Sequence, residues 1–219
     1  MSEFQRARTA DAKRSRETAI LDAARALATR DGVRSVTLTG IAQQIGMHKS
    51  ALLRYFETRE QILLRLAAAE WARWGPELSA ALAMLDDPRD VGGAVSATLT
   101  ARPLFCDLLG HVSLSLERNV SVDSVREYKL VTHGEVDRIG AALRAVLPEL
   151  VEQDAVDVIS TAISVAGTMW QMSTPGEVLS DVYRRDPRLA HAIVDLQPTL
   201  TRILDAVVEG LRVARHAGG

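Results

Sequence analysis

Cysteine, aromatic residues and long apolar runs are all scarce in this sequence. The single cysteine, Cys106, excludes an internal disulfide framework and metal sites built from cysteine pairs. Only 4% of the 219 residues are aromatic, whereas Ala, Leu, Arg and Val are abundant, and this composition favours helices over sheets. No apolar run reaches the roughly 18 residues of a membrane span, and no apolar signal core follows the charged N-terminus. We therefore expect an all-α protein of the cytoplasm.

Signatures of common enzyme sites are missing as well. The sequence contains no GxSxG, HExxH or GxGxxG motif and no phosphate-binding loop. His133 and Asp137 stand four residues apart in a helical pattern, with Glu135 between them, a spacing that metal ligands can use. A solvated polar helix face is the favoured interpretation of these residues. We expect neither enzymatic activity, nor a metal, nor a cofactor.

Helical spacing of apolar residues runs through nearly the whole chain, and alternating strand patterns are absent. Ile20, Ala24 and Leu27 form one stripe that ends before Gly32, a residue suited to a left-handed helix cap. The pattern predicts about nine helices. They include two short ones after Thr37 and around Leu52, a capped one from Thr58 interrupted at Gly75-Pro76, and a long one between Ser121 and Pro148. Two more span about 152–173 and 198–215, and Thr174-Pro175-Gly176 and Asp186-Pro187 mark a loop-rich connector between them.

Positive charge is concentrated at the N-terminal end. Residues 1–59 hold 11 Lys and Arg residues against 6 Asp and Glu residues, whereas residues 60–219 hold 15 against 22. The overall net charge of −2 conceals this division. A basic segment on an acidic remainder indicates that only the N-terminal segment meets a polyanion.

Two short helices joined by a tight turn at Gly46 lie within this basic segment. This is the outline of a helix-turn-helix, whose second helix enters the major groove of DNA. Lys49 and Arg54 are the only cationic side chains on the second helix, which makes them the favoured DNA contacts. Thr37 caps the first helix and lies where a phosphate can also bind. On spacing alone, a structural helical hairpin is an equally good interpretation.

The residues around the turn resemble the signature of the TetR family of transcriptional regulators. Residues 37–63 read TLTGIAQQIGMHKSALLRYFETREQIL. The features in register are Thr37, the pair Ile41-Ala42, Gly46 in the turn, Leu52, the pair Tyr55-Phe56 and Arg59 before a capped helix. The resemblance covers about residues 12–66 and implies that the chain binds double-stranded DNA.

The resemblance also implies a set of DNA contacts. The residues expected to touch bases or the groove are Thr39, Lys49, Ser50 and Leu53, those expected to touch phosphates are Thr37, Tyr55 and Arg59, and Arg54 is expected to reach either. Leu52 and Phe56 are expected to hold the second helix onto the first. His48, Ser50, Leu53 and Gly40 depart from the family's usual capping Ser, Gly, Tyr and acidic residue at these positions. These departures change the base contacts that we expect.

We therefore expect two domains. Residues 1–60 form a three-helix DNA-binding domain with the helix-turn-helix, here called the head. Residues 61–219 form a larger helical domain for effector binding and dimerisation, here called the body. The resemblance implies a ligand-responsive regulator, with a repressor favoured that binds a palindromic operator as a homodimer and is released by a small molecule. A transcriptional activator of the same fold and a helical interaction module without DNA binding are the alternatives.

The last two long helices are the predicted dimer interface, because each is apolar over more than one narrow stripe. The residues expected there are Val156, Ile159 and Ile163 on the first helix and Leu200, Ile203, Leu204, Val207 and Leu211 on the second. Two such helices from each chain form a four-helix seam and set two heads on successive major grooves. Packing within one subunit is the alternative interpretation.

Large, adaptable side chains gather between about residues 60 and 172. They are Trp71, Trp74, Phe105, Tyr128, Met169, Trp170 and Met172, with His111 as a polar neighbour. Aromatic and methionine side chains line apolar ligand sites, and the polar atoms of Tyr, Trp and His orient a ligand. Few charges fall on these faces, so we expect a small effector that is largely apolar. An ordinary core is the alternative for each residue.

Overall fold

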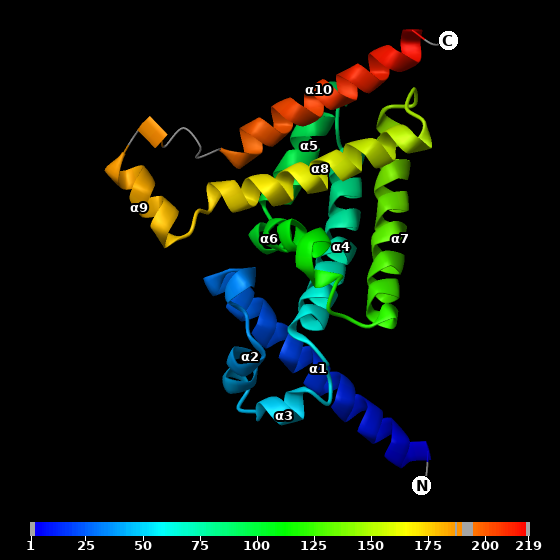
Figure 1. Cartoon of the computed structure of the whole chain (residues 1–219). Helices are drawn as coiled ribbons and strands as arrows, with labels where there is room; N and C mark the ends of the chain where they lie inside the picture. The colour runs from blue at the N-terminus through cyan, green and yellow to red at the C-terminus, as the bar shows by residue number, and fades with distance from the viewer. Residues whose placement is uncertain (1–2, 187, 190–194, 218–219) are drawn as a thin grey trace.

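The computed structural model describes residues 3–186, 188–189 and 195–217, and every regular element in them is a helix. The α-helices are α1 (Glu3–Asp31), α2 (Leu38–Gln44), α3 (Lys49–Leu52), α4 (Arg59–Ala83), α5 (Val91–Thr100), α6 (Pro103–His111), α7 (Val122–Val146), α8 (Glu152–Ser173), α9 (Glu177–Arg185) and α10 (Leu196–Ala217). Short 3₁₀ turns, η1 (Val33–Ser35) and η2 (Pro88–Asp90), precede α2 and α5, and the π turn η3 (Val112–Leu116) follows α6. The predicted all-α fold is confirmed (Figure 1).

The head is built from α1, α2 and α3, which lie at the lower end of the molecule in Figure 1. Ile20 and Ala24 of α1 are fully buried, as the predicted stripe requires. The side chain of Thr37 caps α2 by accepting the Gly40 N–H at 3.0 Å. Gly46 has a φ of 62°, a conformation that favours glycine, and this lets the chain turn sharply between α2 and α3.

A single continuous helix, α4, connects the head to the body. It begins after Thr58, whose hydroxyl accepts the Gln61 N–H at 3.1 Å, while Gln61 Oε1 accepts the Glu57 N–H at 2.8 Å. The predicted cap is confirmed, although the second hydrogen bond reaches one residue further back than a standard capping box. Because no loop intervenes, a displacement of α4 in the body moves the end of the head.

The predicted interruption of this helix at Gly75-Pro76 is wrong. The helix continues to Ala83 with Pro76 inside it. Trp74 and Leu78, on either side of the proline, are fully buried against the rest of the body. This burial outweighs the one backbone hydrogen bond that a proline removes from a helix interior.

The body packs its helices in pairs. The main pairs are α4 with α7, α6 with α8, and α5 with α10. Two glycines allow α6 and α8 to touch, because a Cβ on Gly167 would lie only 2.8 Å from the backbone nitrogen of Gly110. The predicted start of α7 is confirmed, since Ser121 caps it by accepting the Ser124 N–H at 3.3 Å. None of the described helices is long and apolar enough to cross a membrane.

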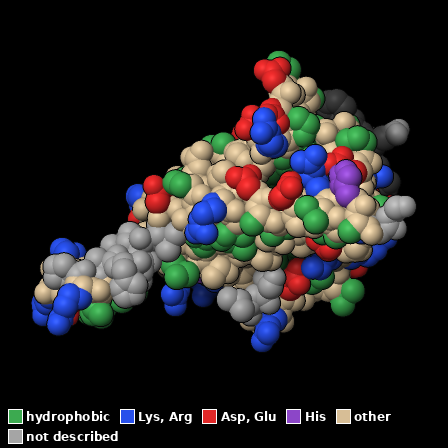
Figure 2. Space-filling model, turned by 90° about the horizontal axis from the view of Figure 1, so that it is seen from above, with side chains coloured by type: hydrophobic (Ala, Val, Ile, Leu, Met, Phe, Trp, Pro, Cys, Tyr) green, Lys and Arg blue, Asp and Glu red, His purple; other side chains and the backbone are tan. Residues whose placement is uncertain are grey.

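The connector between α8 and α10 contains a helix that the sequence analysis missed. Pro175 and Gly176 do interrupt the chain as predicted, but α9 follows them directly, and Pro187 lies outside the described residues. No residue of α9 is buried, and Val178 is 83% exposed. In Figure 1 this helix extends away from the body, and Figure 2 shows the same extension from above. The flanking turn signals hid a helical pattern of only nine residues.

Candidate nucleic-acid interface

The second helix of the helix-turn-helix, α3, is short and is held in place by buried side chains. It comprises only Lys49–Leu52, and the chain then turns through Tyr55. His48 occupies the N-cap without a side-chain hydrogen bond, so its departure from a capping Ser does leave the helix start uncapped. Leu52 and Phe56 are buried, which confirms their predicted role in holding α3 onto α2.

The predicted base contacts of this region lie on the outer face of α3 and in the turn that follows it. Lys49, Ser50 and Arg54 are exposed, and Leu53 is 43% exposed although it is apolar. Within the described part of the chain, no carboxylate forms an ion pair with Lys49 or Arg54. Two unpaired cations beside a hydroxyl and an apolar side chain form a surface suited to the edges of bases and to phosphates.

The predicted phosphate contacts divide into two groups. Thr37 is exposed at the N-cap of α2, as is the predicted base contact Thr39 two residues on, and Tyr55 is half-buried against the core of the head. Arg59 instead lies inside the head. Its guanidinium donates to the main-chain carbonyls of Val33 at 2.6 Å and Val36 at 2.5 Å, and it pairs with Glu60 at 3.1 Å. Arg59 therefore holds the η1 turn in place, a role that the sequence pattern did not indicate.

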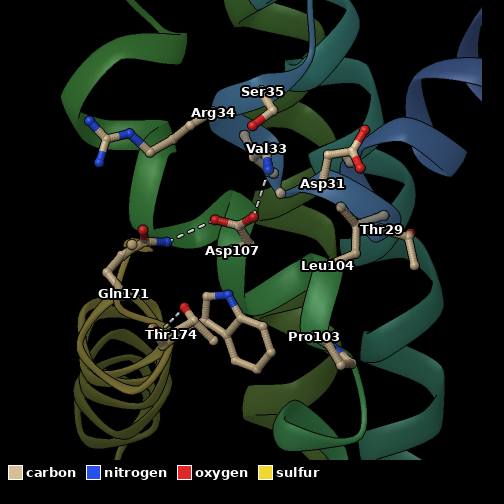
Figure 3. Close-up of a pocket in the computed structure, with 14 residues that line it drawn as sticks. Thr29, Asp31, Val33, Arg34, Ser35, Pro103, Leu104, Asp107, Gln171 and Thr174 are labelled. Carbon is tan, nitrogen blue, oxygen red and sulfur yellow. Dashed lines mark hydrogen bonds between the residues drawn. The ribbon is translucent and has the colours of Figure 1, made fainter. Parts of the chain in front are cut away.

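A buried carboxylate joins the head to the body. Asp107 of α6 accepts the Val33 N–H of η1 at 2.7 Å through Oδ2, and accepts from Gln171 Nε2 of α8 at 2.8 Å through Oδ1 (Figure 3). Gly32 has a φ of 82°, which turns the Val33 N–H toward α6. Neither Asp107 nor Gln171 was among the predicted functional residues. An isolated Asp within the apolar run LFCDLL was the available signal for a buried polar contact.

A second buried carboxylate, Glu70 of α4, ties α1 to the body. Arg25 of α1 and Arg73 pair with its Oε1, the latter at 2.9 Å, and Arg102 pairs with its Oε2 at 3.2 Å. Glu70 is only 4% exposed. Burial alone would raise the pKa of Glu70, but the hydrogen bonds and charges of Arg25 and Arg73 outweigh it and hold this pKa below its usual value.

Three of the predicted ligand-pocket residues pack against one another. The ring centroids of Trp71, Trp74 and Phe105 lie 5.3–5.6 Å apart, and all three side chains are fully buried. The indole nitrogen of Trp74 donates to Thr98 at 3.1 Å, whereas that of Trp71 has no hydrogen-bond partner among the described residues. The cluster forms a dense centre of the body.

Two other predicted pocket residues line clefts. Trp170 lines a cleft of about 500 Å³ at the junction of head and body, and Tyr128 lines a cleft of about 300 Å³ between α4 and α7. Met169 is buried and His111 is half-buried, and neither lines these two clefts. Burial lowers the pKa of His111, although the nearby Asp107 carboxylate opposes this effect.

The predicted dimer residues lie on α8 and α10, which pack against each other. Ile159, Leu200 and Leu204 are buried within the single chain. The remaining five, Val156, Ile163, Ile203, Val207 and Leu211, are only half-buried. His133 and Asp137, the pair considered as metal ligands, are exposed on α7 and contact each other at 3.0 Å.

Comparison with known families identifies this architecture. The family model described as bacterial regulatory proteins, tetR family, matches residues 20–66. The model described as tetracyclin repressor-like, C-terminal domain, matches residues 68–215. The chain belongs to the TetR family. The predicted family is thereby confirmed from both the head and the body.

Solved TetR-family structures share this fold. The fatty acid degradation regulator FadR from Bacillus halodurans is 16% identical with a TM-score of 0.53, covering 90% of this chain and 94% of that chain. FadR from Bacillus subtilis in complex with stearoyl-CoA is 13% identical with a TM-score of 0.54, covering 87% and 98%. RolR in complex with resorcinol is 16% identical with a TM-score of 0.53, covering 90% and 95%. No curated protein matches the chain significantly.

Membership of the TetR family gives the class of activity. Proteins of this family are transcription regulators that bind operator DNA as dimers and respond to small-molecule ligands. This chain is therefore a ligand-responsive DNA-binding regulator, and its head carries the DNA-binding surface.

Proposed function

We propose that this TetR-family regulator is a repressor in the cytoplasm that binds a palindromic operator as a homodimer. Thr39, Lys49, Ser50 and Leu53 contact bases or the groove, Arg54 contacts a base or a phosphate, and Thr37 and Tyr55 contact the flanking phosphates. A small, largely apolar effector bound by the body releases the DNA. Residues 1–60 and 61–219 act as the DNA-binding and the effector-binding units.

The exposed face of α3 is the observation that carries this proposal. Lys49 and Arg54 are solvent-exposed without an ion pair among the described residues, while Leu52 beneath them is fully buried. Long cationic side chains above a buried apolar residue are suited to binding guanine edges and phosphates in the major groove. Their placement supports direct base recognition by this face.

The half-buried residues of α8 and α10 support the homodimer. Ile163 and Val207 pack partly against their own chain and keep part of their apolar surface in contact with solvent. A second copy related by twofold symmetry buries the same surface on both chains. Two heads held at a fixed spacing then match a palindromic operator.

Relatives of known ligand support effector-controlled release. The Thermus thermophilus FadR, 19% identical with a TM-score of 0.50, is a transcriptional repressor in complex with lauroyl-CoA. RolR binds resorcinol. In this chain two clefts, one lined by Trp170 and one by Tyr128, offer apolar surface for an effector.

A gel-shift experiment with DNA from the protein's own promoter region tests the proposal. We expect a salt-sensitive complex of one dimer with an inverted repeat, because phosphate contacts release counterions. Binding that does not distinguish this DNA from a scrambled duplex would reject operator recognition.

The dimer is tested by placing a charge at its expected centre. Val207→Asp and Ile163→Asp should each raise the dimer dissociation constant by at least about 30-fold, because a carboxylate would be buried in an apolar seam. Leu130→Asp, at an exposed site on α7, is the control with the same change of charge. Sedimentation at low micromolar concentration should show monomers for the first two variants only. Dimers in all three would place the interface elsewhere.

A further inference from the structure

The cleft at the junction of head and body carries a buried carboxylate, Asp107, that forms no ion pair with Lys or Arg among the described residues. It lies where the end of α1, the η1 turn, α6 and the C-terminal end of α8 meet, and its volume is about 500 Å³. Figure 3 shows Asp107 between Val33 of the head and Gln171 of α8. A cleft of this size holds a small organic molecule.

Asp107 is the charged group within the wall of this cleft. It is only 9% exposed, and both of its oxygens accept hydrogen bonds from neutral donors, the Val33 N–H and the Gln171 amide. In the described part of the chain, the sole group within ion-pair distance is His111, with Nδ1 at 3.9 Å. Burial lowers the pKa of this imidazole, which favours its neutral form. The carboxylate therefore lacks a cationic partner.

The other charges around the cleft do not supply one. Asp31 is neutralised by a two-point contact with Arg30, at 2.8 and 2.6 Å. The positive charges of Arg34, which lines the cleft, and of Arg59 act on the neighbouring His111, but neither side chain forms an ion pair with Asp107 among the described residues. An ionised carboxylate accepts up to about four hydrogen bonds, so Asp107 has capacity for a further donor.

The rest of the cleft wall is suited to a flat, apolar part of a ligand. Trp170, Leu104 and Pro103 line the cleft, and Trp170 is half-buried there. An indole ring attracts both apolar rings and cations. The wall thus combines an anionic group with an aromatic one in a single cleft.

We infer that this junction cleft binds a small organic cation, an amine attached to an aromatic or alicyclic ring, with its ammonium on Asp107 and its ring against Trp170. The expected effect of this ligand on operator binding rests on the proposed function. A bound ammonium donates to Asp107 Oδ2 beside the Val33 N–H and draws negative charge away from that hydrogen bond, which weakens the link from α6 to the head. Since the ligand then prefers the state in which this link is open, it lowers operator affinity.

Calorimetry without DNA tests the site itself, using tryptamine as the probe. We expect tryptamine to bind the wild-type chain, while 3-ethylindole and indole-3-propionate, which share the ring and lack the ammonium, bind at least about 30-fold more weakly. Asp107→Asn should lose tryptamine to a similar degree, because it keeps an oxygen for Val33 and removes the charge. Asp31→Asn, which changes a carboxylate already paired with Arg30, is the matched control and should bind as the wild type does. A thermal melt verifies that both variants fold.

Several results would overturn the inference. Tryptamine binding that is absent, that survives Asp107→Asn, or that is matched by indole-3-propionate would exclude a cation site at Asp107. Fluorescence anisotropy with operator DNA then tests the consequence, and tryptamine should weaken operator binding by about tenfold or more in the wild type only. If the ligand binds through Asp107 and leaves operator affinity unchanged, the coupling is contradicted. A chain that binds no operator at all would reject the proposed function, and calorimetry would still decide the cation site.

Discussion

At the scale of single residues, the cationic side chains of the head lie in two different environments. Lys49 and Arg54 extend into solvent from a face whose underside is buried. Arg59 turns inward and donates to two carbonyls of the η1 segment. Exposure and hydrogen-bond partners, rather than charge alone, therefore separate a DNA contact from a structural support.

Removing the charged side chain of Lys49 or of Arg54 should weaken recognition of one operator position. Lys49→Ala and Arg54→Ala are each expected to cost about 1–3 kcal/mol of specific binding, with little effect on folding. Arg138→Ala on α7, an exposed arginine paired with Glu135, is the control for loss of one positive charge. Anisotropy titrations with matched and mismatched duplexes measure the change. Equal losses for all three variants would indicate a general electrostatic effect instead of base contacts.

Removing the guanidinium of Arg59 should mainly lower the stability of the fold. Arg59→Ala is expected to lower the free energy of unfolding by about 1.5–3 kcal/mol, because charge-assisted hydrogen bonds to Val33 and Val36 are lost. Arg59→Lys keeps the charge without the planar fork and should recover only part of the loss. Urea unfolding provides the measurement. If unfolding is unchanged while the salt dependence of DNA binding falls by about one ion, Arg59 is a phosphate contact after all.

At the scale of elements, close helix contacts determine which parts move together. α6 and α8 approach so closely at Gly110 and Gly167 that a methyl group on Gly167 would meet backbone atoms at 2.8–2.9 Å. Backbone cannot rotate away as a long side chain can, so the two helices behave as a unit. Asp107, on this same α6, extends the unit to the head.

A pair of glycine substitutions tests this contact. Gly167→Ala should destabilise the body by about 1–3 kcal/mol, because α6 and α8 are forced apart. Gly134→Ala, in the exposed part of α7 where nothing lies within 4 Å, should stabilise it by about 0.5–1 kcal/mol through helix propensity. Thermal and urea unfolding of both variants decide the matter. A shift of the same sign at the two sites would contradict the close approach.

At the scale of the whole molecule, two buried carboxylates connect the body to the head. Glu70 connects α4 to Arg25 of α1 and to Arg102, and Asp107 connects α6 to the η1 turn. Both links cross the boundary at which the two family models meet, between residues 66 and 68. We therefore expect the spacing of two heads in a dimer to depend on how the body is arranged.

The Glu70 link should make stability depend on pH. Its pKa is lowered in the folded chain, so its contribution is complete above its ordinary value of 4.5 and is lost as the pH falls through the lower folded value. Glu70→Gln should cost on the order of 3 kcal/mol at pH 7, and much less at pH 3. Glu127→Gln, which affects an exposed pair with Arg65, should cost about 0.5 kcal/mol or less at either pH. If Glu70→Gln lowered the free energy of unfolding equally at both pH values, the result would contradict a stabilising role for the ionised Glu70.

The sequence predicted the all-α architecture, and the same local patterns carry the proposed DNA contacts. Periodic apolar residues, the caps at Thr37, Thr58 and Ser121, and the motif around Gly46 all act within a few residues of each other. The inward turn of Arg59 and the bonds of Asp107 join segments 23 or more residues apart in the chain. Such contacts depend on how helices pack, and no short pattern in one sequence records them.

Selection of DNA from a random pool tests the central claim most directly, namely that α3 of a dimer reads an operator. Duplexes retained by the wild-type protein should converge on an inverted repeat whose half-sites lie about 34–36 Å apart or at a multiple of one helical turn. The double variant Lys49→Ala, Arg54→Ala should retain no such sequence. A pool that stays random with the wild-type protein, or that yields the same repeat with the double variant, would contradict this account.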